Sequence, residues 1–111
     1  MKISNLIEDM GFRLLNDVMV EDKEVEGLNC CDLLSWVMAN GKENDAWITV
    51  QTHSNILAVA SLLDMSCVII PEAIKVEEET LNKANEQGVV ILGTELGSYD
   101  IFKKFYEAGL R

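Results

Sequence analysis

The sequence contains a single histidine, His53, and little positive charge. Nine lysine and arginine residues stand against nineteen aspartate and glutamate residues, which gives a net charge of -10 over 111 residues. Such a charge repels phosphate backbones and anionic lipid headgroups, so we expect neither nucleic acid nor a membrane surface as a partner. One histidine cannot form a two-histidine metal site, and the spacing of the carboxylates does not place an oxygen-ligand set together. We therefore expect no metal and no cofactor.

Long apolar runs and glycine-rich phosphate loops are also absent. No apolar run approaches the eighteen or so residues of a membrane-spanning helix, and the first residues lack the apolar stretch of a secretion signal, so we expect a cytoplasmic protein. The seven glycines form neither the G-x-x-x-x-G-K-[ST] nor the G-x-G-x-x-G pattern. ATP hydrolysis by a P-loop and hydride transfer with a dinucleotide are therefore not expected.

Cysteine is scarce and its number is odd. The three cysteines are Cys30, Cys31 and Cys67. The adjacent pair matches none of the usual structural zinc spacings. We expect all three to be reduced, buried thiols.

The chain is apolar enough to fold as one domain. With 111 residues and 49% apolar side chains, it can bury a core without disulfides or a structural metal. No internal repeat or low-complexity tract interrupts it. We expect a single domain over residues 1–111.

The clearest structural signal lies in the middle of the chain. β-Branched residues next to Trp47 favour a buried strand over residues 46–51. Apolar residues at helical spacing then predict a helix over residues 55–64. A short polar turn separates this strand from this helix.

Similar signals predict the other elements, with cap and stop residues at their ends. In the first half we expect a helix over residues 3–10 capped by Ser4 and ended by Gly11, a strand over 12–15, a turn at 16–17, an acidic loop at 21–24, extended chain over 25–28 and a helix over 33–40 capped by Asp32. In the second half we expect a strand over 67–70 ended by Pro71, an exposed helix opened by residues 77–79 and ended by Gly88, a strand over 89–92 and a last helix opened by Ser98.

Strands and helices alternate through the second half of the chain as βαβαβα. Consecutive units of this kind pair their strands in parallel through right-handed crossovers. We expect these crossovers to place helices on both faces of the sheet. The predicted fold is therefore of the α/β class, a three-layer α/β/α domain with a mostly parallel sheet.

A candidate binding site follows from this fold. Turns that leave the carboxyl ends of parallel strands share one edge of the sheet, where such folds bind ligands beside helix N-termini. The turn after the central strand carries hydroxyl, amide and imidazole groups. We expect one depression for an anionic small molecule or a nucleotide, lined by Gln51, Thr52, His53, Ser54, Asn55, Gly93 and Thr94.

His53 also has a simpler interpretation. An imidazole at a strand end is commonly a structural group that hydrogen-bonds to the backbone. A catalytic His53 would need a nucleophile such as Ser54, Cys30 or Cys31, and adjacent side chains seldom align for proton transfer. We expect the structural role and no catalytic residue.

Three stretches of the sequence carry a family resemblance. They are WITVQTHSNILAVA at residues 47–60, GLNCCDLLSWVMAN at residues 27–40 and GVVILGTELGSYDIFKKFY at residues 88–106. Together they resemble a small stand-alone member of the DRTGG domain family, which is similar to the N-terminal domain of HPr kinase/phosphorylase. Thr52-His53 stand where the family has Asp-Arg, and Pro71-Glu72-Ala73 stand where it has Thr-Gly-Gly.

The resemblance implies a regulatory or oligomerising module. Similar domains lie beside nucleotide-binding CBS domains in some pyrophosphatases and within some phosphotransacetylases, and the kinase activity of the larger relative resides in a P-loop domain that this chain lacks. We expect a non-catalytic regulatory or small-ligand-sensing domain. The alternatives are an adapter or subunit of a larger redox or signalling complex with a protein partner, and a small enzyme that uses His53.

The helix over residues 55–64 also suggests self-association. Beyond its first residue, its only polar side chains are Ser61 and Asp64, so apolar side chains surround most of its circumference. We expect a symmetric homodimer in which this surface meets its copy. The alternative is a neighbouring helix of the same chain, with Trp36 and Met38 turned toward it.

Overall fold

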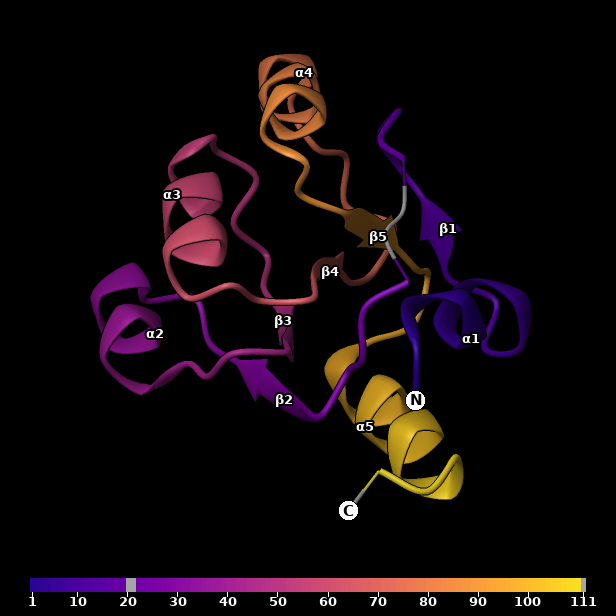
Figure 1. Ribbon diagram of the computed structural model, residues 1–111. Coiled ribbons are helices and arrows are strands. Elements are labelled where there is room, and N and C mark those ends of the chain that lie inside the picture. The colour runs from indigo at the N-terminus through magenta and orange to yellow at the C-terminus, as the bar shows by residue number, and fades with distance from the viewer. Residues whose placement is uncertain (20–21, 111) are drawn as a thin grey trace.

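The computed structural model describes residues 1–19 and 22–110 (Figure 1). The helices of this part are α1 (Ile3–Glu8), α2 (Leu34–Asn40), α3 (Asn55–Leu62), α4 (Glu78–Gln87) and α5 (Ser98–Glu107). The strands are β1 (Arg13–Leu14), β2 (Gly27–Cys30), β3 (Asp45–Ile48), β4 (Cys67–Ile70) and β5 (Ile91–Gly93).

The described strands form one sheet in the order β1-β5-β4-β3-β2. Strands β2 to β5 are parallel, and β1 pairs antiparallel with β5 at one edge. The inner strands β3 and β4 are buried along their whole length, as continuous apolar runs predict for a parallel sheet covered on both faces. The predicted α/β fold with a mostly parallel sheet is confirmed.

Helices cover both faces of the sheet, for a reason other than the expected one. Helices α2, α3 and α4 lie on one face, and α1 and α5 lie on the other (Figure 1). The strands from β2 to β5 are added in one direction across the sheet, so crossovers of one hand place all three connecting helices on the same face. The first and last helices are what cover the opposite face.

Each face of the sheet has its own apolar core. Alternate residues of β3 point to opposite faces, so Ile48 packs in the α1 and α5 cluster and Trp47 packs in the cluster with α2, α3 and α4. Trp47 is fully buried, and its indole Nε1 donates a hydrogen bond to the carbonyl oxygen of Cys31 at 2.9 Å. On the other face the rings of Phe12 and Phe105 pack with centroids 5.9 Å apart.

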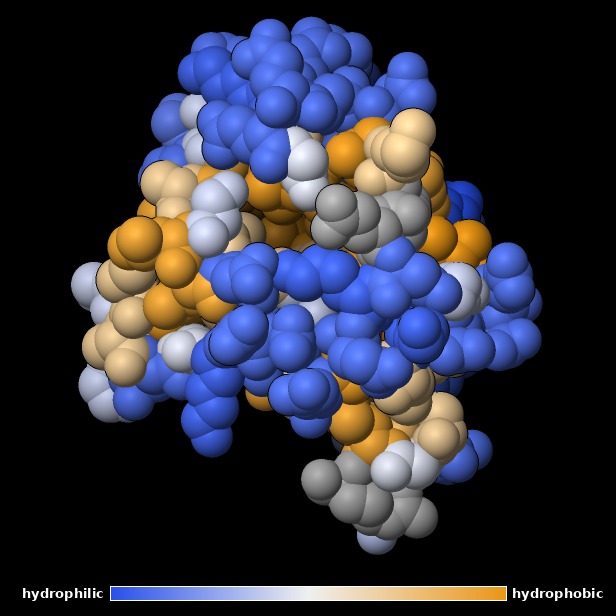
Figure 2. Space-filling model, in the orientation of Figure 1, coloured by the Kyte–Doolittle hydropathy of each residue, from blue (hydrophilic) through white to orange (hydrophobic). Residues whose placement is uncertain are grey.

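Several element ends differ from the prediction. Strands β2 and β5 each begin two residues later than the predicted extended segments. Gly11 and Gly88 do adopt the left-handed backbone, with φ angles of 76° and 71°, and Gly88 directly ends α4. The outer surface of α4 is hydrophilic (Figure 2), as the prediction of an exposed helix requires. Glu21, in the predicted acidic loop, lies outside the described residues.

Two predicted helix caps are wrong. Ser4 lies inside α1, where its hydroxyl donates to Asp22 Oδ2 at 3.0 Å. Asp32 makes no cap for α2, because its Oδ1 accepts hydrogen bonds from the hydroxyl of Thr49 at 2.8 Å and from the Val50 amide at 2.9 Å. In both cases, a partner distant in sequence takes the side chain that a local motif would have used. Ser98 is the first residue of α5, as predicted.

Asn16 has a larger role than a turn residue. Its side chain is buried, and its Nδ2 donates to the Val89 carbonyl oxygen at 2.8 Å. Its Oδ1 accepts from the Ile91 amide at 3.0 Å. The side-chain amide of Asn16 therefore supplies the hydrogen-bond partners of two backbone groups at the start of β5. Beside it, the backbone amide of Leu15 donates to the Ile91 carbonyl oxygen at 2.8 Å.

The apolar surface of α3 is largely covered within the chain. Leu57 is 1% exposed, and α2 and α4 flank α3 on its two sides. Met38 packs in this cluster, but Trp36, which was expected to turn toward α3, is 60% exposed. The burial of Leu57 weakens the case for a homodimer interface on α3, although Leu62 of the same helix is 73% exposed.

Candidate functional site

The turns that follow β2, β3, β4 and β5 lie at one edge of the sheet. Because these strands are parallel, their carboxyl ends coincide, with Ile48 beside Ile69 and Ile70 beside Gly93. Gln51 and Gly93 therefore leave the same edge, which is the geometric condition of the predicted site. We call residues 31–33, 49–55, 71–79 and 93–97 the carboxyl edge.

Gln51 and Thr52 are engaged in holding the carboxyl edge together. Gln51 Nε2 donates to the carbonyl oxygen of Asp32 at 2.9 Å. The Thr52 carbonyl oxygen accepts from the hydroxyl of Thr80 at 2.7 Å, and the Thr52 hydroxyl donates to Glu77 Oε2 at 3.4 Å. These bonds tie the turn after β3 to the loop after β2 and to the start of α4.

His53 caps the turn that enters α3. Its Nδ1 accepts a hydrogen bond from the Asn55 amide at 3.1 Å, and its carbonyl oxygen accepts from the Ile56 amide at 3.2 Å. The Leu57 amide donates to the Ser54 carbonyl oxygen at 3.0 Å. The amides of Asn55, Ile56 and Leu57 are thus bonded inside the turn, so they are not free to bind an anion beside the N-terminus of α3. The expected structural bond between His53 and the backbone is confirmed.

Gly93 and Thr94 offer little to a ligand. Both residues are buried, and a Cβ atom on Gly93 would lie 2.9 Å from the side chain of Leu15. The Thr94 hydroxyl oxygen accepts a hydrogen bond from the Leu96 amide at 3.2 Å. Of the seven predicted residues, His53 and Asn55 are exposed, and Gln51, Thr52 and Ser54 are partly exposed.

The carboxyl edge is acidic. Its carboxylates come from Asp32, from Glu72 and from the start of α4 at residues 77–79. All of these residues are exposed, as His53 is. The pKa of Glu79 is lowered by its hydrogen bond from Lys83, by the charge of Lys83 and, less strongly, by the charge of His53. An edge with this field favours uncharged or cationic ligands, or a nucleotide that arrives with a bound metal cation.

The loop after β4 keeps a backbone suited to glycine. Glu72 and Ala73, which the sequence resemblance aligns with Gly-Gly of the DRTGG family, have φ angles of 58° and 56°. Their amides donate to the carbonyl oxygens of Leu96 at 2.9 Å and Thr94 at 2.8 Å. These two hydrogen bonds hold a left-handed conformation that side chains with a Cβ atom disfavour.

Replacing Ala73 with glycine is expected to raise the free energy of unfolding by about 0.5 to 1 kcal/mol. Relief of the left-handed strain outweighs the larger entropy of glycine in the unfolded chain. The control is Ala58→Gly on the exposed side of α3, which should lower the free energy by about 1 kcal/mol. Urea unfolding of both variants measures the two effects, and a loss of stability in Ala73→Gly would contradict the assignment.

The three thiols differ in exposure. Cys67 is buried, as expected, whereas Cys31 is partly buried and Cys30 is exposed, so the expectation of three buried thiols is wrong. Burial raises the pKa of the Cys67 thiol from 9.0 to about 12. The Cys30 Sγ lies 3.8 Å from the hydroxyl of Ser98 at the start of α5.

Cys67 should make the fold sensitive to alkaline pH. Its folded pKa lies above its unfolded pKa, so its contribution is complete below pH 9 and is lost as pH rises toward the folded value. At pH 10 the expected loss is about 1.4 kcal/mol of unfolding free energy. Urea unfolding of the wild type and Cys67→Ala at pH 8 and 10 measures it, because lysine and tyrosine titrations affect both proteins equally. Equal losses in the two proteins would contradict the prediction.

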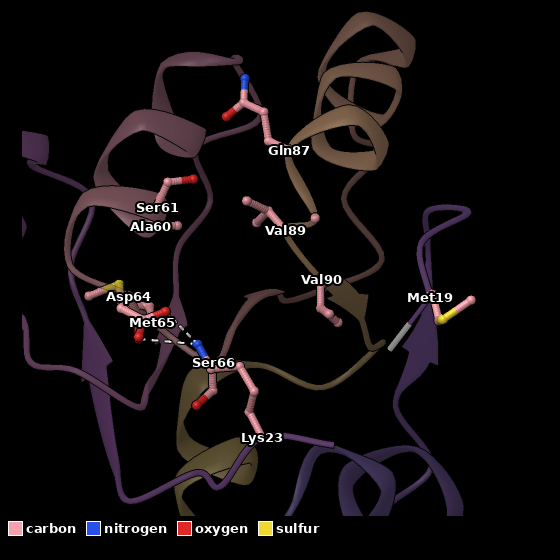
Figure 3. Close-up of a pocket in the computed structure, with 11 residues that line it drawn as sticks. Met19, Lys23, Ala60, Ser61, Asp64, Met65, Ser66, Gln87, Val89 and Val90 are labelled. Carbon is pink, nitrogen blue, oxygen red and sulfur yellow. Dashed lines mark hydrogen bonds and ion pairs between the residues drawn. The ribbon is translucent and has the colours of Figure 1, made fainter. Parts of the chain in front are cut away.

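A cavity lies at the opposite, amino-terminal edge of the sheet. It has a volume of about 340 Å³ and lies between the ends of α3 and α4 (Figure 3). Ala60, Met65, Val89 and Val90 supply apolar walls, and Lys23 Nζ pairs with Asp64 Oδ1 at 2.7 Å within its lining. Figure 2 shows an apolar hollow in this region, below α4. None of the seven predicted residues lines this cavity.

Sequence reasoning missed this cavity because it searched only the carboxyl ends of the strands. The signal that was available is the polar segment Asp64, Met65 and Ser66 between a helix and a buried strand, together with Gly88 after the next helix. Within residues 1–19 and 22–110, no group of three or more histidine, cysteine, aspartate or glutamate side chains could hold a metal ion. In the same part of the chain, no helix has the length and apolarity needed to cross a membrane.

Comparison with known proteins identifies the fold. No protein-family model and no curated protein matches the sequence. Among solved structures, the chain is similar to the CBS and DRTGG domains of the regulatory region of Clostridium perfringens pyrophosphatase, complexed with its activator diadenosine tetraphosphate. The TM-score is 0.67 at 14% sequence identity, over 91% of this chain and 44% of that one. The chain therefore shares an α/β fold found in a regulatory region, and it spans less than half of that structure's length.

Proposed function

We propose that this chain is a DRTGG-like regulatory domain, spanning residues 1–111, that senses a small ligand and has no catalytic activity of its own. The observation that carries the proposal is the backbone similarity over 91% of the chain to a regulatory region that binds a nucleotide activator. The left-handed pair Glu72-Ala73 at the position of the family's Gly-Gly supports the same relationship. We also propose that the domain acts as a homodimer.

The geometry of His53 favours binding over catalysis. Its Nδ1 accepts the Asn55 amide, so a general base would have to use Nε2. Ser54 is its neighbour in sequence, and adjacent side chains seldom align for proton transfer. An exposed imidazole held in a fixed orientation is well suited to hydrogen-bond a ligand.

We propose that the ligand binds at the carboxyl edge, against the exposed side chains of His53 and Asn55. Gln51, Thr52, Ser54, Gly93 and Thr94 shape and support this edge through their hydrogen bonds and packing. Because the edge is acidic, a nucleotide should bind there with Mg²⁺ bridging its phosphates to nearby carboxylates. Adenosine, which lacks phosphate, tests whether the base and ribose bind without the contacts that Mg²⁺ and the phosphates would make.

A thermal-shift experiment tests the proposal. The purified chain is heated with adenosine, AMP, ATP or diadenosine tetraphosphate at about 1 mM, each with and without Mg²⁺. A ligand present at ten times its dissociation constant stabilises by about 1.4 kcal/mol, which raises the midpoint of a domain of this size by about 5 °C. No shift with any of these compounds would overturn the nucleotide-sensing proposal.

Two variants locate the binding site. His53→Ala should abolish the ligand-induced shift, measured from the variant's own unliganded midpoint. That midpoint should itself fall by a few degrees, to about the extent expected for loss of a helix cap, because the Asn55 amide loses its bond to Nδ1. Ser61→Phe, on an exposed position that lines the amino-edge cavity, should leave the shift intact. If Ser61→Phe abolishes the shift and His53→Ala does not, the ligand occupies the amino-edge cavity and the proposed carboxyl-edge site is wrong.

A further inference from the structure

Strand β2 ends the described sheet on the side opposite β1. The Cys31 amide donates to the Ile48 carbonyl oxygen at 3.2 Å, so the main chain at Cys31 faces β3. Because backbone groups alternate in direction along a strand, those of Asn29 and Gly27 also face β3, and the N–H and C=O groups of Leu28 and Cys30 face away from the sheet. The outer side of β2 therefore presents a row of hydrogen-bonding groups.

This edge lacks the usual protection against pairing. Proteins commonly guard an exposed strand with lysine, another charge or proline. Strand β2 has the sequence Gly-Leu-Asn-Cys, with neither charge nor proline. The strand is thus chemically suited to accept another strand.

Helix α2 adds an apolar ridge beside this edge. Leu33, Trp36 and Asn40 are spaced at i, i+3 and i+7, so they form one stripe along the helix. Asn40 lines a groove of about 410 Å³ together with Gly27, Leu28 and Asn29 of β2, which places the stripe on the β2 side of α2. Leu33 is 63% exposed and Trp36 is 60% exposed. The edge of the sheet therefore carries hydrogen-bonding groups and, next to them, two large exposed apolar side chains.

We propose that β2 pairs antiparallel with β2 of a second copy of this chain, about a two-fold axis that passes beside Leu28. Leu28 then faces Leu28 of the second copy, and this pair exchanges two hydrogen bonds. Gly27 of each copy faces Asn29 of the other in pairs that exchange no hydrogen bonds. The two sheets become one continuous sheet, and the two α2 helices cover Leu33 and Trp36 across the axis.

Charge and register favour a second copy over an unrelated strand. In this register, Glu26 faces Cys30 of the second copy, so no like charges meet across the strand pair. Cys30 lies next to Ser98, the first residue of the ten-residue helix α5. The carboxylate of Glu26 therefore approaches the positive end of the other copy's helix, twice in the dimer because of the symmetry. In a two-fold contact, the apolar patch of each copy also covers the same patch of the other copy, so one interface buries both.

Sedimentation velocity at tens of micromolar tests the interface. We expect a species of twice the 12.4 kDa monomer mass. Trp36→Lys should weaken the dimer by about tenfold or more, as expected for a central aromatic contact. Ser35→Lys, at the exposed neighbouring position, and Leu62→Lys, on the exposed side of α3, should leave the mass unchanged. A monomeric wild type, or loss of the dimer only in Leu62→Lys, would overturn the β2 interface.

A crosslink tests the register directly. In a Cys30→Ser, Cys31→Ser background, Leu28→Cys should form a disulfide between copies on mild oxidation, because facing Cα atoms in such a hydrogen-bonded pair lie about 5.5 Å apart, within the range of a disulfide. Leu62→Cys in the same background should remain reduced. A dimer that survives Trp36→Lys and forms no Leu28→Cys crosslink would refute the register. The interface rests on the dimer part of the proposed function alone, since nucleotide binding is read separately by the thermal shift.

Discussion

Replacing Leu57 with glutamate is expected to lower the free energy of unfolding by about 4 kcal/mol or more, enough to prevent stable folding. Leu57 of α3 is 1% exposed and packs in the apolar cluster between its helix and the sheet. Helices α2 and α4 flank α3 on either side. A carboxylate there would be buried without a partner, which costs several kcal/mol in addition to the lost apolar burial. Urea unfolding followed by circular dichroism measures the loss.

The adjacent position supplies the control for Leu57→Glu. Ala58 is exposed on the same helix, so Ala58→Glu should change the free energy by no more than about 0.5 kcal/mol. The pair also tests where the chain associates. If Leu57→Glu folds with wild-type stability and only its mass changes, then Leu57 lies at an interface between copies, and the burial of α3 within its own chain is wrong.

Replacing Asn16 with leucine should lower the free energy of unfolding by about 3 kcal/mol. The substitution keeps a similar shape but leaves the Val89 carbonyl oxygen and the Ile91 amide without the partner that Asn16 supplies. A buried backbone group that loses its partner costs about 1 to 3 kcal/mol. The loss is measured from the midpoint and slope of urea unfolding.

An exposed asparagine provides the comparison for Asn16→Leu. Asn82 lies on the exposed side of α4, so Asn82→Leu should stay within about 0.5 kcal/mol of the wild type. Amide hydrogen exchange at Ile91 should be faster in Asn16→Leu because the start of β5 loses its side-chain bond. A stability equal to that of Asn82→Leu would show that water replaces the lost hydrogen bonds.

Apolar patterning predicted the architecture well. The continuous run at Cys67–Ile70, ended by Pro71, gave strand β4 with its correct bounds, because a strand covered on both faces needs apolar residues at every position. Gly88 marked the end of α4 correctly, since a left-handed residue there is a local requirement of the chain. These signals depend on neighbours within a few residues, so they can be read without knowing the fold.

Polar side chains were predicted much less well. Ser4, Asp32 and Asn16 were assigned local roles, yet their hydrogen-bond partners lie 18, 17 or more than 70 residues away in sequence. A short polar side chain can bond to its own backbone or to a distant group at similar energy. The arrangement of the strands decides which of these is within reach.

The candidate site divides in the same way. The order of strands and helices was enough to place Gln51, His53 and Gly93 at one edge of the sheet, because parallel strands share their carboxyl ends. It could not show that Gly93 packs against Leu15, that the first amides of α3 are already bonded, or that a cavity lies at the other edge. Sequence alone determined the α/β fold and the edge where polar turns gather, through the periodic placement of apolar residues. Only the tertiary structure decided which polar groups remain exposed and that β2 is an open edge, because both depend on contacts between segments far apart in the chain.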